Sequence, residues 1–329
     1  MLAIETSCDE TAAAVVRGRE VLSNVVASQI DMHAKWGGVV PEAAARAHVE
    51  AVVPVIDEAF ALAGRPAIRG VAVTNRPGLV GALSVGVTAA KALATAWGVP
   101  MVGVHHLEGH LLSPFAVDGP EPTVPALALV VSGGHTEMVA IDGLGEYRLL
   151  GETLDDAAGE AFDKGARLLG LGYPGGRAVQ EAAKDGDCRR YKLPRALPKD
   201  RYHWSFSGLK TAMLRLVETE GTGLNVPDAA ASLQAAVVDA LAEKVAGVLD
   251  ELGPRSFFLV GGVAANEALR SRLADECRRR GVEFWTPTID LCTDNAAMIG
   301  IAGSFRLARG DRDSIDLDVT AGAPLPGLR

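Results

Sequence analysis

The sequence predicts an α/β protein made of two similar lobes that face each other across a central cleft. Its 329 residues are enough for two domains of ordinary size. Hydrophobic residues make up 48% of the chain but aromatic residues only 5%, so the apolar content is mostly small and aliphatic, which is typical of closely packed strands and helices. Two strand-and-turn patterns each occur twice, and this repetition indicates an internal duplication.

The first repeated pattern is a set of strands joined by a turn of small polar residues. An apolar strand begins at Leu2, leads into the turn ETSCDET, and is followed by strands at residues 13–16 and 21–26. About 124 residues later, an apolar strand at residues 126–131 leads into the turn SGGHT and a strand at residues 137–141. The same hairpin design therefore recurs in the second half of the chain.

The second repeated pattern is an apolar strand, a glycine-containing turn and a helix-forming stretch. It occurs as GVAVTNRPGL at residues 70–79 and as SFFLVGGVAAN at residues 256–266. In the second half, roughly 60 additional residues precede this pattern, and they include the helical sequence DDAAGEAFDKGARLLGL. The two repeated patterns together account for both lobes.

The lobes are expected at residues 1–118 and 119–329, with a proline-rich connection at residues 114–125. The additional residues are interpreted as an inserted region at about 151–255 that lines the cleft, where ligands usually bind. A single doubly wound sheet with added elements is the alternative.

Charge and cysteine content exclude several classes of protein. The net charge of −9 excludes a global positive field, so contact with nucleic acid requires a local basic patch. The four cysteines are scattered and form no C-x-x-C pair, which argues against a zinc ribbon or a disulfide framework. The chain opens on the strand-like MLAIETS without a basic leader or an apolar run near 18 residues, so we expect a cytoplasmic protein with no membrane contact.

The sequence HHLEGH at residues 105–110 predicts a metal site. His106 and His110 stand four residues apart and would project from the same face of one helical turn. Asp294 is the best-placed third ligand, and because it follows a strand-like segment of the second lobe, the ion would be held from both lobes. A His, His, Asp set suits iron or zinc with positions left open for substrate. Histidines at the surface or the edge of the core are the alternative.

A zinc peptidase is disfavoured, although paired histidines on a helix suggest one. Such enzymes carry H-E-x-x-H or H-x-x-E-H, with the catalytic base beside a ligand. Here the intervening acid is Glu108, about 200° around the helix from His106.

Two glycine-containing turns are candidates for nucleotide binding. In VVSGGHT, residues 130–136, backbone N–H groups can approach phosphate oxygens without obstruction by a Cβ atom. In GGVAAN, residues 261–266, the start of a helix offers backbone amides and the Asn266 side chain. Neither turn is a P-loop or a complete G-x-G-x-x-G, and ordinary hairpin turns are the alternative.

Four further residues are weaker candidates for a site. Asp163 could bond ribose hydroxyls and Gly176 could admit a ligand, whereas a solvent-facing carboxylate and a simple Pro-Gly turn are the plainer interpretations. Asp9 and Glu10, in the first turn, could hold a catalytic water or a metal, although carboxylates in turns usually face solvent.

One basic segment, residues 189–204, is a candidate nucleic-acid patch. Its cationic residues are Arg189, Arg190, Lys192, Arg195, Lys199 and Arg201. Asp200 is its single acid, and Tyr191, Tyr202 and Trp204 are interleaved. Cationic side chains bind phosphates while aromatic rings stack on exposed bases. A solvated loop is the alternative.

Nine motifs, in one order, closely resemble the tRNA N(6)-adenosine threonylcarbamoyltransferase family, whose members were formerly called O-sialoglycoprotein endopeptidases. They are ETSCDET, WGGVVPEAAARAH, PGLVGALSVG, HHLEGH, VVSGGHT, EAFDKGARLLGLGYPGG, SFSGLKTA, GGVAAN and CTDNAAMIG. The resemblance covers nearly the whole chain. It implies the two-lobed fold shared by actin, sugar kinases and Hsp70-type ATPases, known as the ASKHA fold.

The resemblance implies transfer of the threonylcarbamoyl group from threonylcarbamoyl-AMP to the N(6) amine of the adenosine 3′ of the anticodon, in tRNAs that read codons beginning with A. It implies one divalent metal per chain, Fe(2+) or sometimes Zn(2+), on His106, His110 and Asp294. The positions that match the adenylate-binding residues of the family are Val130, Val131, Ser132, Gly133, Gly134, Asp163, Gly176 and Asn266. A paralogous TsaB-like subunit and a small TsaE-like ATPase are the implied partners.

The sequence departs from the family pattern at Arg76, where glycine is usual, and at Trp36, where tyrosine is usual. Arg76 puts the conformation of its loop in doubt because arginine rarely adopts a positive φ. A non-catalytic nucleotide-binding scaffold of the same fold is the alternative function. Because such scaffolds resemble paralogues without the H-x-x-x-H pattern, the presence of His106 and His110 favours an enzyme.

Overall fold

The computed structural model describes residues 1–36, 38–117 and 119–327, and the chain divides into two compact units. Unit 1 comprises Met1–Glu121 and residues 287–327, and unit 2 comprises Pro122–Thr286. The C-terminal segment, expected in the second lobe, therefore belongs to unit 1. Residues 37, 118, 328 and 329, which fall within motifs or lobe ranges named above, lie outside the described residues.

Unit 1 is built on a five-stranded mixed sheet. Its elements are β1 (Leu2–Glu5), β2 (Glu10–Arg17), β3 (Glu20–Ser28), α1 (Ile30–Ala34), α2 (Pro41–Leu62), β4 (Val71–Arg76), α3 (Val80–Trp97), β5 (Met101–His105), α4 (His106–Leu112), a short 3₁₀ turn (Ser113–Phe115), α10 (Ile289–Cys292) and α11 (Ala296–Ala308). The strand order is β3-β2-β1-β4-β5. β1, β2 and β3 are antiparallel neighbours, whereas β4 and β5 run parallel to β1.

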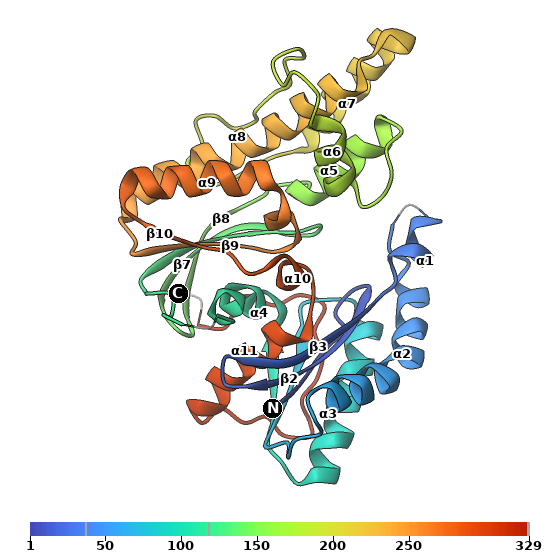
Figure 1. Ribbon diagram of the computed structural model, residues 1–329, viewed down its shortest axis with the longest axis vertical. Helices are drawn as coiled ribbons and strands as arrows, with labels where there is room; N and C mark the ends of the chain where they lie inside the picture. The colour runs from blue at the N-terminus through green and yellow to red at the C-terminus, as the bar shows by residue number, and fades with distance from the viewer. Residues whose placement is uncertain (37, 118, 328–329) are drawn as a thin grey trace. The chain divides into compact units, whose positions relative to one another are not determined.

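The alternation of side chains along β1 explains why helices cover both faces of this sheet. Leu2 and Ile4 are fully buried in a cluster that includes residues of α2 and α3. Ala3 points to the opposite face and packs against Gly300 of α11. Figure 1 shows the helices α2, α3 and α11 of this unit. A Cβ atom on Gly300 would lie 2.8 Å from Val16, and one on Gly303 would lie 2.5 Å from Ala72. This close approach fixes α11 on unit 1 and explains the change in the expected boundary.

Unit 2 repeats the same sheet. Its elements are β6 (Ala126–Val131), β7 (Thr136–Gly143), β8 (Glu146–Glu152), α5 (Ala158–Leu168), α6 (Gly175–Ala183), α7 (Ser207–Glu220), a 3₁₀ turn (Gly221–Gly223), α8 (Val226–Leu252), β9 (Ser256–Val260), a second 3₁₀ turn (Gly262–Ala265), α9 (Glu267–Arg280) and β10 (Glu283–Trp285). The order β8-β7-β6-β9-β10 matches that of unit 1, with β6, β7 and β8 antiparallel and β9 and β10 parallel to β6. The duplication predicted from the two repeated patterns is confirmed.

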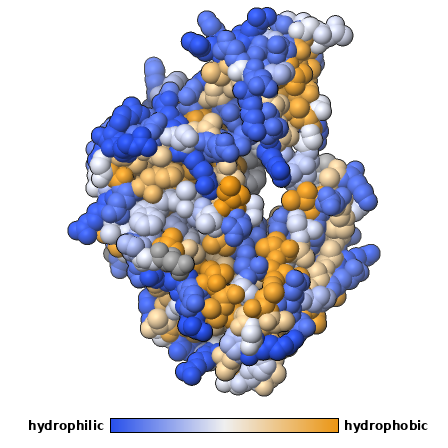
Figure 2. Space-filling model, viewed as in Figure 1, coloured by the Kyte–Doolittle hydropathy of each residue, from blue (hydrophilic) through white to orange (hydrophobic). Residues whose placement is uncertain are grey.

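The additional residues of unit 2 form helices between its hairpin and its last two strands. Residues 153–255 lie between β8 and β9, whereas only residues 29–70 lie between β3 and β4. Helices α5, α6, α7 and α8 pack on one another, and α9 packs on α8 and β10. The surface over α9 is strongly hydrophilic in the view of Figure 2, as its sequence EALRSRLADECRRR requires.

One helix, α3, is long and apolar enough to cross a membrane by length and composition alone. The prediction that no apolar run near 18 residues exists was therefore wrong for residues 80–97. Leu83, Val87 and Ala90 of this helix are buried in unit 1, and the helix packs on β4 and α2. Its apolar residues thus contribute to the core of the unit.

Candidate metal centre

Helix α4 carries both predicted histidine ligands, and the residue before it fixes where it starts. His105 is the N-cap: its Nδ1 accepts a hydrogen bond from the Leu107 backbone N–H, and its Nε2 lies 2.9 Å from the Ala323 carbonyl oxygen. The four-residue spacing then places His106 and His110 on one face, with ring centroids 4.7 Å apart and an interplanar angle of 88°. Both imidazoles are buried.

Helix α11 fixes the third predicted ligand, Asp294, which immediately precedes it. Asn295 is the N-cap of α11, and its Oδ1 accepts a hydrogen bond from the Met298 N–H. The Asn295 amide also donates to the carbonyl oxygens of Leu291 and Thr293. With its amide engaged on both sides, Asn295 holds the backbone at Asp294 in one conformation.

A glycine lets α4 approach α11 closely. A Cβ atom on Gly109 would lie 2.8 Å from the end of the Ile299 side chain and 3.2 Å from Met298 Cγ. Because Gly109 stands between the two histidines, this approach brings them to the start of α11 and so to Asp294.

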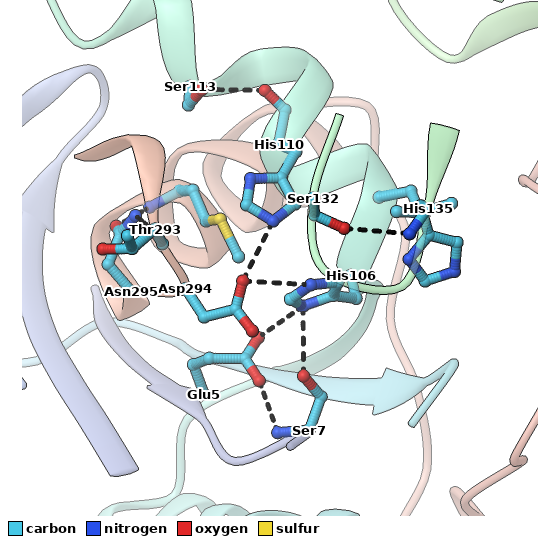
Figure 3. Close-up of polar contacts among 12 residues, drawn as sticks. Glu5, Ser7, His106, His110, Ser113, Ser132, His135, Thr293, Asp294 and Asn295 are labelled. Atoms are coloured by element: carbon cyan, nitrogen blue, oxygen red, sulfur yellow. Dashed lines mark hydrogen bonds and ion pairs between the residues drawn. The ribbon is translucent and has the colours of Figure 1, made fainter. Parts of the chain in front are cut away.

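The three predicted ligands converge on one point (Figure 3). Asp294 Oδ1 lies 3.1 Å from His110 Nε2 and 3.4 Å from His106 Nε2, and one ligand atom from each residue lies within 4.8 Å of the others. All three residues belong to unit 1. The prediction that the ion is held from both lobes was therefore wrong, because α11 packs on the sheet of unit 1.

The distances from Asp294 to the two histidines fit a shared divalent cation. With bonds of about 2.1 Å, ligand atoms at tetrahedral or octahedral angles lie about 3.0 to 3.4 Å apart. The two distances to Asp294 Oδ1 fall in this range. Two imidazoles and one carboxylate are also the donor set of the facial site of non-haem iron, and three protein ligands leave further positions open.

A buried carboxylate, Glu5, stands behind His106. Its Oε2 lies 3.1 Å from His106 Nδ1 and accepts a hydrogen bond from the Thr74 hydroxyl at 2.5 Å, and its Oε1 accepts one from the Ser7 N–H. Ser7 Oγ also lies 3.2 Å from His106 Nδ1. Glu5, Ser7 and Thr74 were not predicted from the sequence. The one signal for Glu5 is an acid at the end of the otherwise apolar strand LAIE.

The charges of the cluster determine the ionisation of its members. Burial alone would lower the pKa of His106, but the carboxylates of Asp294 and Glu5 raise it well above its usual value. Burial alone would raise the pKa of Asp294, but the His106 charge and the hydrogen bonds from both histidines hold it well below its usual value. Burial lowers the pKa of His110. A cation and a proton therefore compete for His106 Nε2.

The other two acidic candidates, Asp9 and Glu10, lie in the turn and at the start of β2. Asp9 is buried and Glu10 is half-buried. Burial, followed by the charges of Asp294 and Asp9, raises the pKa of Glu10 to about 9. Without a cation nearby, Glu10 is therefore protonated at neutral pH and cannot accept a proton there.

The first two turns of α3 hold the turn that follows β1 and contains Thr6 and Ser7. Thr6 donates a hydrogen bond to the Ala82 carbonyl oxygen, and a Cβ atom on Gly86 would lie only 2.4 Å from Thr6 Oγ1. A Cβ atom on Gly78 would lie 2.6 Å from the Ser7 carbonyl oxygen. Arg76, whose conformation the sequence put in doubt, is the last residue of β4 and has no positive φ.

In unit 2, five of the predicted adenylate-binding residues, 130–134, lie at the carboxyl end of β6, whose parallel neighbour is β9. Val130 and Val131 are fully buried, so neither side chain can meet a ligand. A Cβ atom at Gly133 or Gly134 would meet nothing within 4 Å. Gly261, at φ 91°, would place a Cβ atom 2.4 Å from the Val131 carbonyl oxygen, so only glycine lets the two strand ends meet.

The remaining predicted residues of this group are linked to these turns through α5, α6 and α9. The Gly159 N–H donates to the Ser132 carbonyl oxygen at the start of α5. Asp163 Oδ1 accepts a hydrogen bond from the Gly175 N–H at 2.7 Å, whereas a Cβ atom at Gly176 would meet open space. Asn266 caps α9, and its amide also donates to Gln234. Asp163 and Asn266 thus already have structural partners.

A family model described as tRNA N6-adenosine threonylcarbamoyltransferase matches residues 20–301. The chain is 55% identical over 325 residues to the tRNA N6-adenosine threonylcarbamoyltransferase of Anaeromyxobacter dehalogenans strain 2CP-1, with 97% of each chain covered. The chain belongs to this family. It is 51% identical over 355 residues to the enzyme of the same name from Thermomicrobium roseum, with 99% of this chain and 96% of that one covered.

Because the chain belongs to the threonylcarbamoyltransferase family, it is an enzyme, a transferase. The alternative of a non-catalytic scaffold is therefore rejected.

Two solved structures show the ASKHA fold that the sequence predicted. Full-length HypF in its phosphate- and nucleotide-bound form has a TM-score of 0.58 at 13% identity and covers 98% of this chain and 47% of its own. Component A of the Acidaminococcus fermentans (R)-2-hydroxyglutaryl-CoA dehydratase has a TM-score of 0.52 at 15% identity, with 94% and 98% covered.

The basic segment of this threonylcarbamoyltransferase is only partly available to a ligand. Arg195 pairs with Asp239 and Arg201 with Glu251. Trp204 is buried and donates from its indole N–H to the Ala240 carbonyl oxygen, so it cannot stack on a base. Cationic side chains remain exposed at Arg189, Arg190, Lys192 and Lys199.

Proposed function

We propose that this protein transfers the threonylcarbamoyl group of threonylcarbamoyl-AMP to the N(6) amine of the adenosine 3′ of the anticodon, in tRNAs that read codons beginning with A. The observation that carries the proposal is the convergence of His106, His110 and Asp294 at separations suited to one cation, in a chain of this family. The amine nitrogen forms a bond to the carbamoyl carbon, the bond from that carbon to the phosphate oxygen breaks, and AMP leaves. The amine proton passes to the surrounding water or to a protein base.

The proposed cofactor is one divalent metal ion per chain, Fe(2+) or Zn(2+), held by His106 Nε2, His110 Nε2 and Asp294. When bound, such an ion polarises a carbonyl or phosphate oxygen of the donor and offsets the charge that develops during attack. Glu5 and the Asn295 cap hold two of the ligands in place. Asp9 and Glu10 remain candidates for a role in proton transfer, and the mechanism requires no covalent protein nucleophile.

Unit 2 is the proposed binding site for the adenylate. Backbone N–H groups of Gly133 and Gly134, whose Cβ positions are open, would bind its phosphate, and Val130, Val131 and Ser132 would hold this turn at the end of β6. The second oxygen of the Asp163 carboxylate would accept a hydrogen bond from a ribose hydroxyl. Gly176 and Asn266 stand at the starts of α6 and α9, where helix dipoles favour an anion.

For tRNA, we infer that the exposed cations at Arg189, Arg190, Lys192 and Lys199 contact phosphates. Arg195 and Arg201 contribute less because carboxylates of α8 hold them at 2.5 and 2.9 Å, whereas the pair of Arg189 with Asp187 is longer, at 3.7 Å, and exposed. A paralogous TsaB-like subunit and a small TsaE-like ATPase are the expected partners, and the expected location is the cytoplasm.

The test supplies the purified protein with preformed threonylcarbamoyl-AMP and unmodified tRNA, with and without the two partners. The modified nucleoside is measured by mass spectrometry after digestion of the tRNA. We expect N(6)-threonylcarbamoyladenosine at the position 3′ of the anticodon. Transfer only from another acyl donor, or only to another nucleoside, would show that the proposed reaction is wrong.

A further inference from the structure

We propose that Glu5 is a positioning residue of the metal centre and acts on one ligand, His106. Glu5 holds a proton on His106 Nδ1, so that Nε2 faces the cation. This inference rests on the metal site in the proposed function. It adds Glu5, a buried side chain that does not itself coordinate the cation, to the residues of the site.

The contacts of Glu5 suit a carboxylate that only accepts hydrogen bonds. The side chain is fully buried. The Ser7 N–H donates to Oε1 and the Thr74 hydroxyl donates to Oε2, and the same Oε2 lies 3.1 Å from His106 Nδ1. Two donors, one on each oxygen, hold the carboxylate in the orientation that faces the imidazole. An ionised carboxylate has no proton to give, so His106 Nδ1 is the donor in their contact.

This contact determines which nitrogen of His106 can bind an ion. A neutral imidazole carries one proton and one lone pair, on different nitrogens, and only the lone pair ligates. With the proton on Nδ1, the lone pair lies on Nε2, the nitrogen that faces Asp294 Oδ1 at 3.4 Å (Figure 3). Carboxylates behind ligating histidines orient the ring and raise its basicity.

The second histidine lacks this support. His110 Nδ1 is buried and has no hydrogen-bond partner among the described residues. The neighbouring Ser113 hydroxyl instead donates to the His110 backbone carbonyl oxygen. Loss of Glu5 therefore removes a hydrogen-bond partner from His106 and none from His110, which makes its effect distinguishable from a general loosening of the site.

The test is Glu5→Gln, which keeps the size of the side chain but replaces one oxygen with an NH₂ donor. If the amide oxygen faces the Ser7 N–H, the NH₂ group faces His106 and selects the tautomer with the proton on Nε2. If the amide is reversed, the NH₂ group meets the Ser7 N–H donor. We expect the affinity for Zn(2+) alone, and for Fe(2+) alone under anaerobic conditions, to fall about 10- to 100-fold in chelator competition.

A second readout separates positioning from loss of structure. In the metal-free protein, ¹⁵N NMR of the His106 ring should show a proton on Nδ1 in the wild type and its loss from Nδ1 in Glu5→Gln. Glu276→Gln is the matched control, because Glu276 is another buried carboxylate but lies in unit 2 among arginines. It should lower stability and leave metal affinity unchanged.

If Glu5→Gln does not fold, Thr74→Val removes only the hydroxyl that holds Oε2 and should weaken metal binding several-fold. Equal metal affinity in wild type and Glu5→Gln, or in wild type and Thr74→Val, would overturn the role of Glu5 while leaving the metal site intact. A wild-type protein that binds neither ion would instead remove the metal site, and with it the role of Glu5.

Discussion

The clamp between α3 and the turn after β1 can be tested by adding one methyl group at Gly86. A Cβ atom there would lie 2.4 Å from Thr6 Oγ1 and 3.3 Å from Thr6 Cγ2, and Thr6 is fully buried. Overpacking of this kind costs about 1–3 kcal/mol. Alanine is favoured over glycine inside a helix by roughly 0.5–1 kcal/mol. We therefore expect Gly86→Ala to lower the free energy of unfolding by about 1–2 kcal/mol.

The partner of the clash gives a sharper version of this test. Thr6→Ala removes the obstructing atoms but loses the hydrogen bond to the Ala82 carbonyl oxygen, at a cost of about 1 kcal/mol. In the double variant the new methyl group has room. The loss of unfolding free energy in this variant should therefore be about 1–2 kcal/mol smaller than the sum of the losses in the two single variants.

Denaturant unfolding of the four proteins measures this coupling, and metal affinity of the same samples reports whether Glu5 moves with the turn. Gly247→Ala is the matched control, because Gly247 lies on the exposed side of α8 with open space around its Cβ position. It should be neutral or stabilising. Wild-type stability in Gly86→Ala, or strictly additive energies, would refute the packing argument.

Three further predictions concern unit 2. Gly134→Ala should leave stability within about 0.5 kcal/mol, because its Cβ position is open, yet weaken binding of threonylcarbamoyl-AMP in a titration where Gly223→Ala does not. Burial, followed by the facing charge of Glu152, raises the pKa of Glu137 to about 7 from its ordinary 4.5, so the folded state loses stability as pH rises between these values. The difference in unfolding free energy between Glu137→Gln and wild type should therefore shift in favour of the variant by about 1–2 kcal/mol from pH 4 to pH 8, and a constant difference would contradict this. Reversing the charges of Arg189, Arg190 and Lys192 should weaken tRNA binding and reduce its salt dependence. Unchanged affinity for tRNA would show that tRNA binds to another surface.

The parts of the fold that were predicted correctly are those whose signal is local in the sequence. Apolar runs bounded by small polar turns identified the strands that begin at Leu2 and Ala126, and their recurrence identified the duplication. The four-residue spacing identified the helix face shared by His106 and His110. Each strand or helix signal spans about ten residues or fewer, and the duplication follows from two such local patterns that occur twice.

What the sequence could not show depends on contacts between distant residues. The packing of Gly300 against Ala3 places α11, and with it Asp294, in unit 1, and no pattern near Asp294 reports it. Asp239 and Glu251, on α8, neutralise two arginines of the basic segment some 40 to 50 residues earlier. Glu5 resembles any acid at the end of a strand, and its surrounding donors come from residues that the fold brings together.

The most direct test of metal-dependent transfer measures bound metal and threonylcarbamoyl transfer together, in wild type and in His110→Ala. Both proteins receive threonylcarbamoyl-AMP and the same unmodified tRNA, so that donor synthesis is not involved. We expect about one equivalent of iron or zinc and modified tRNA with the wild type, and loss of both with the variant. Normal transfer by His110→Ala without bound metal would show that transfer does not depend on a metal at this site.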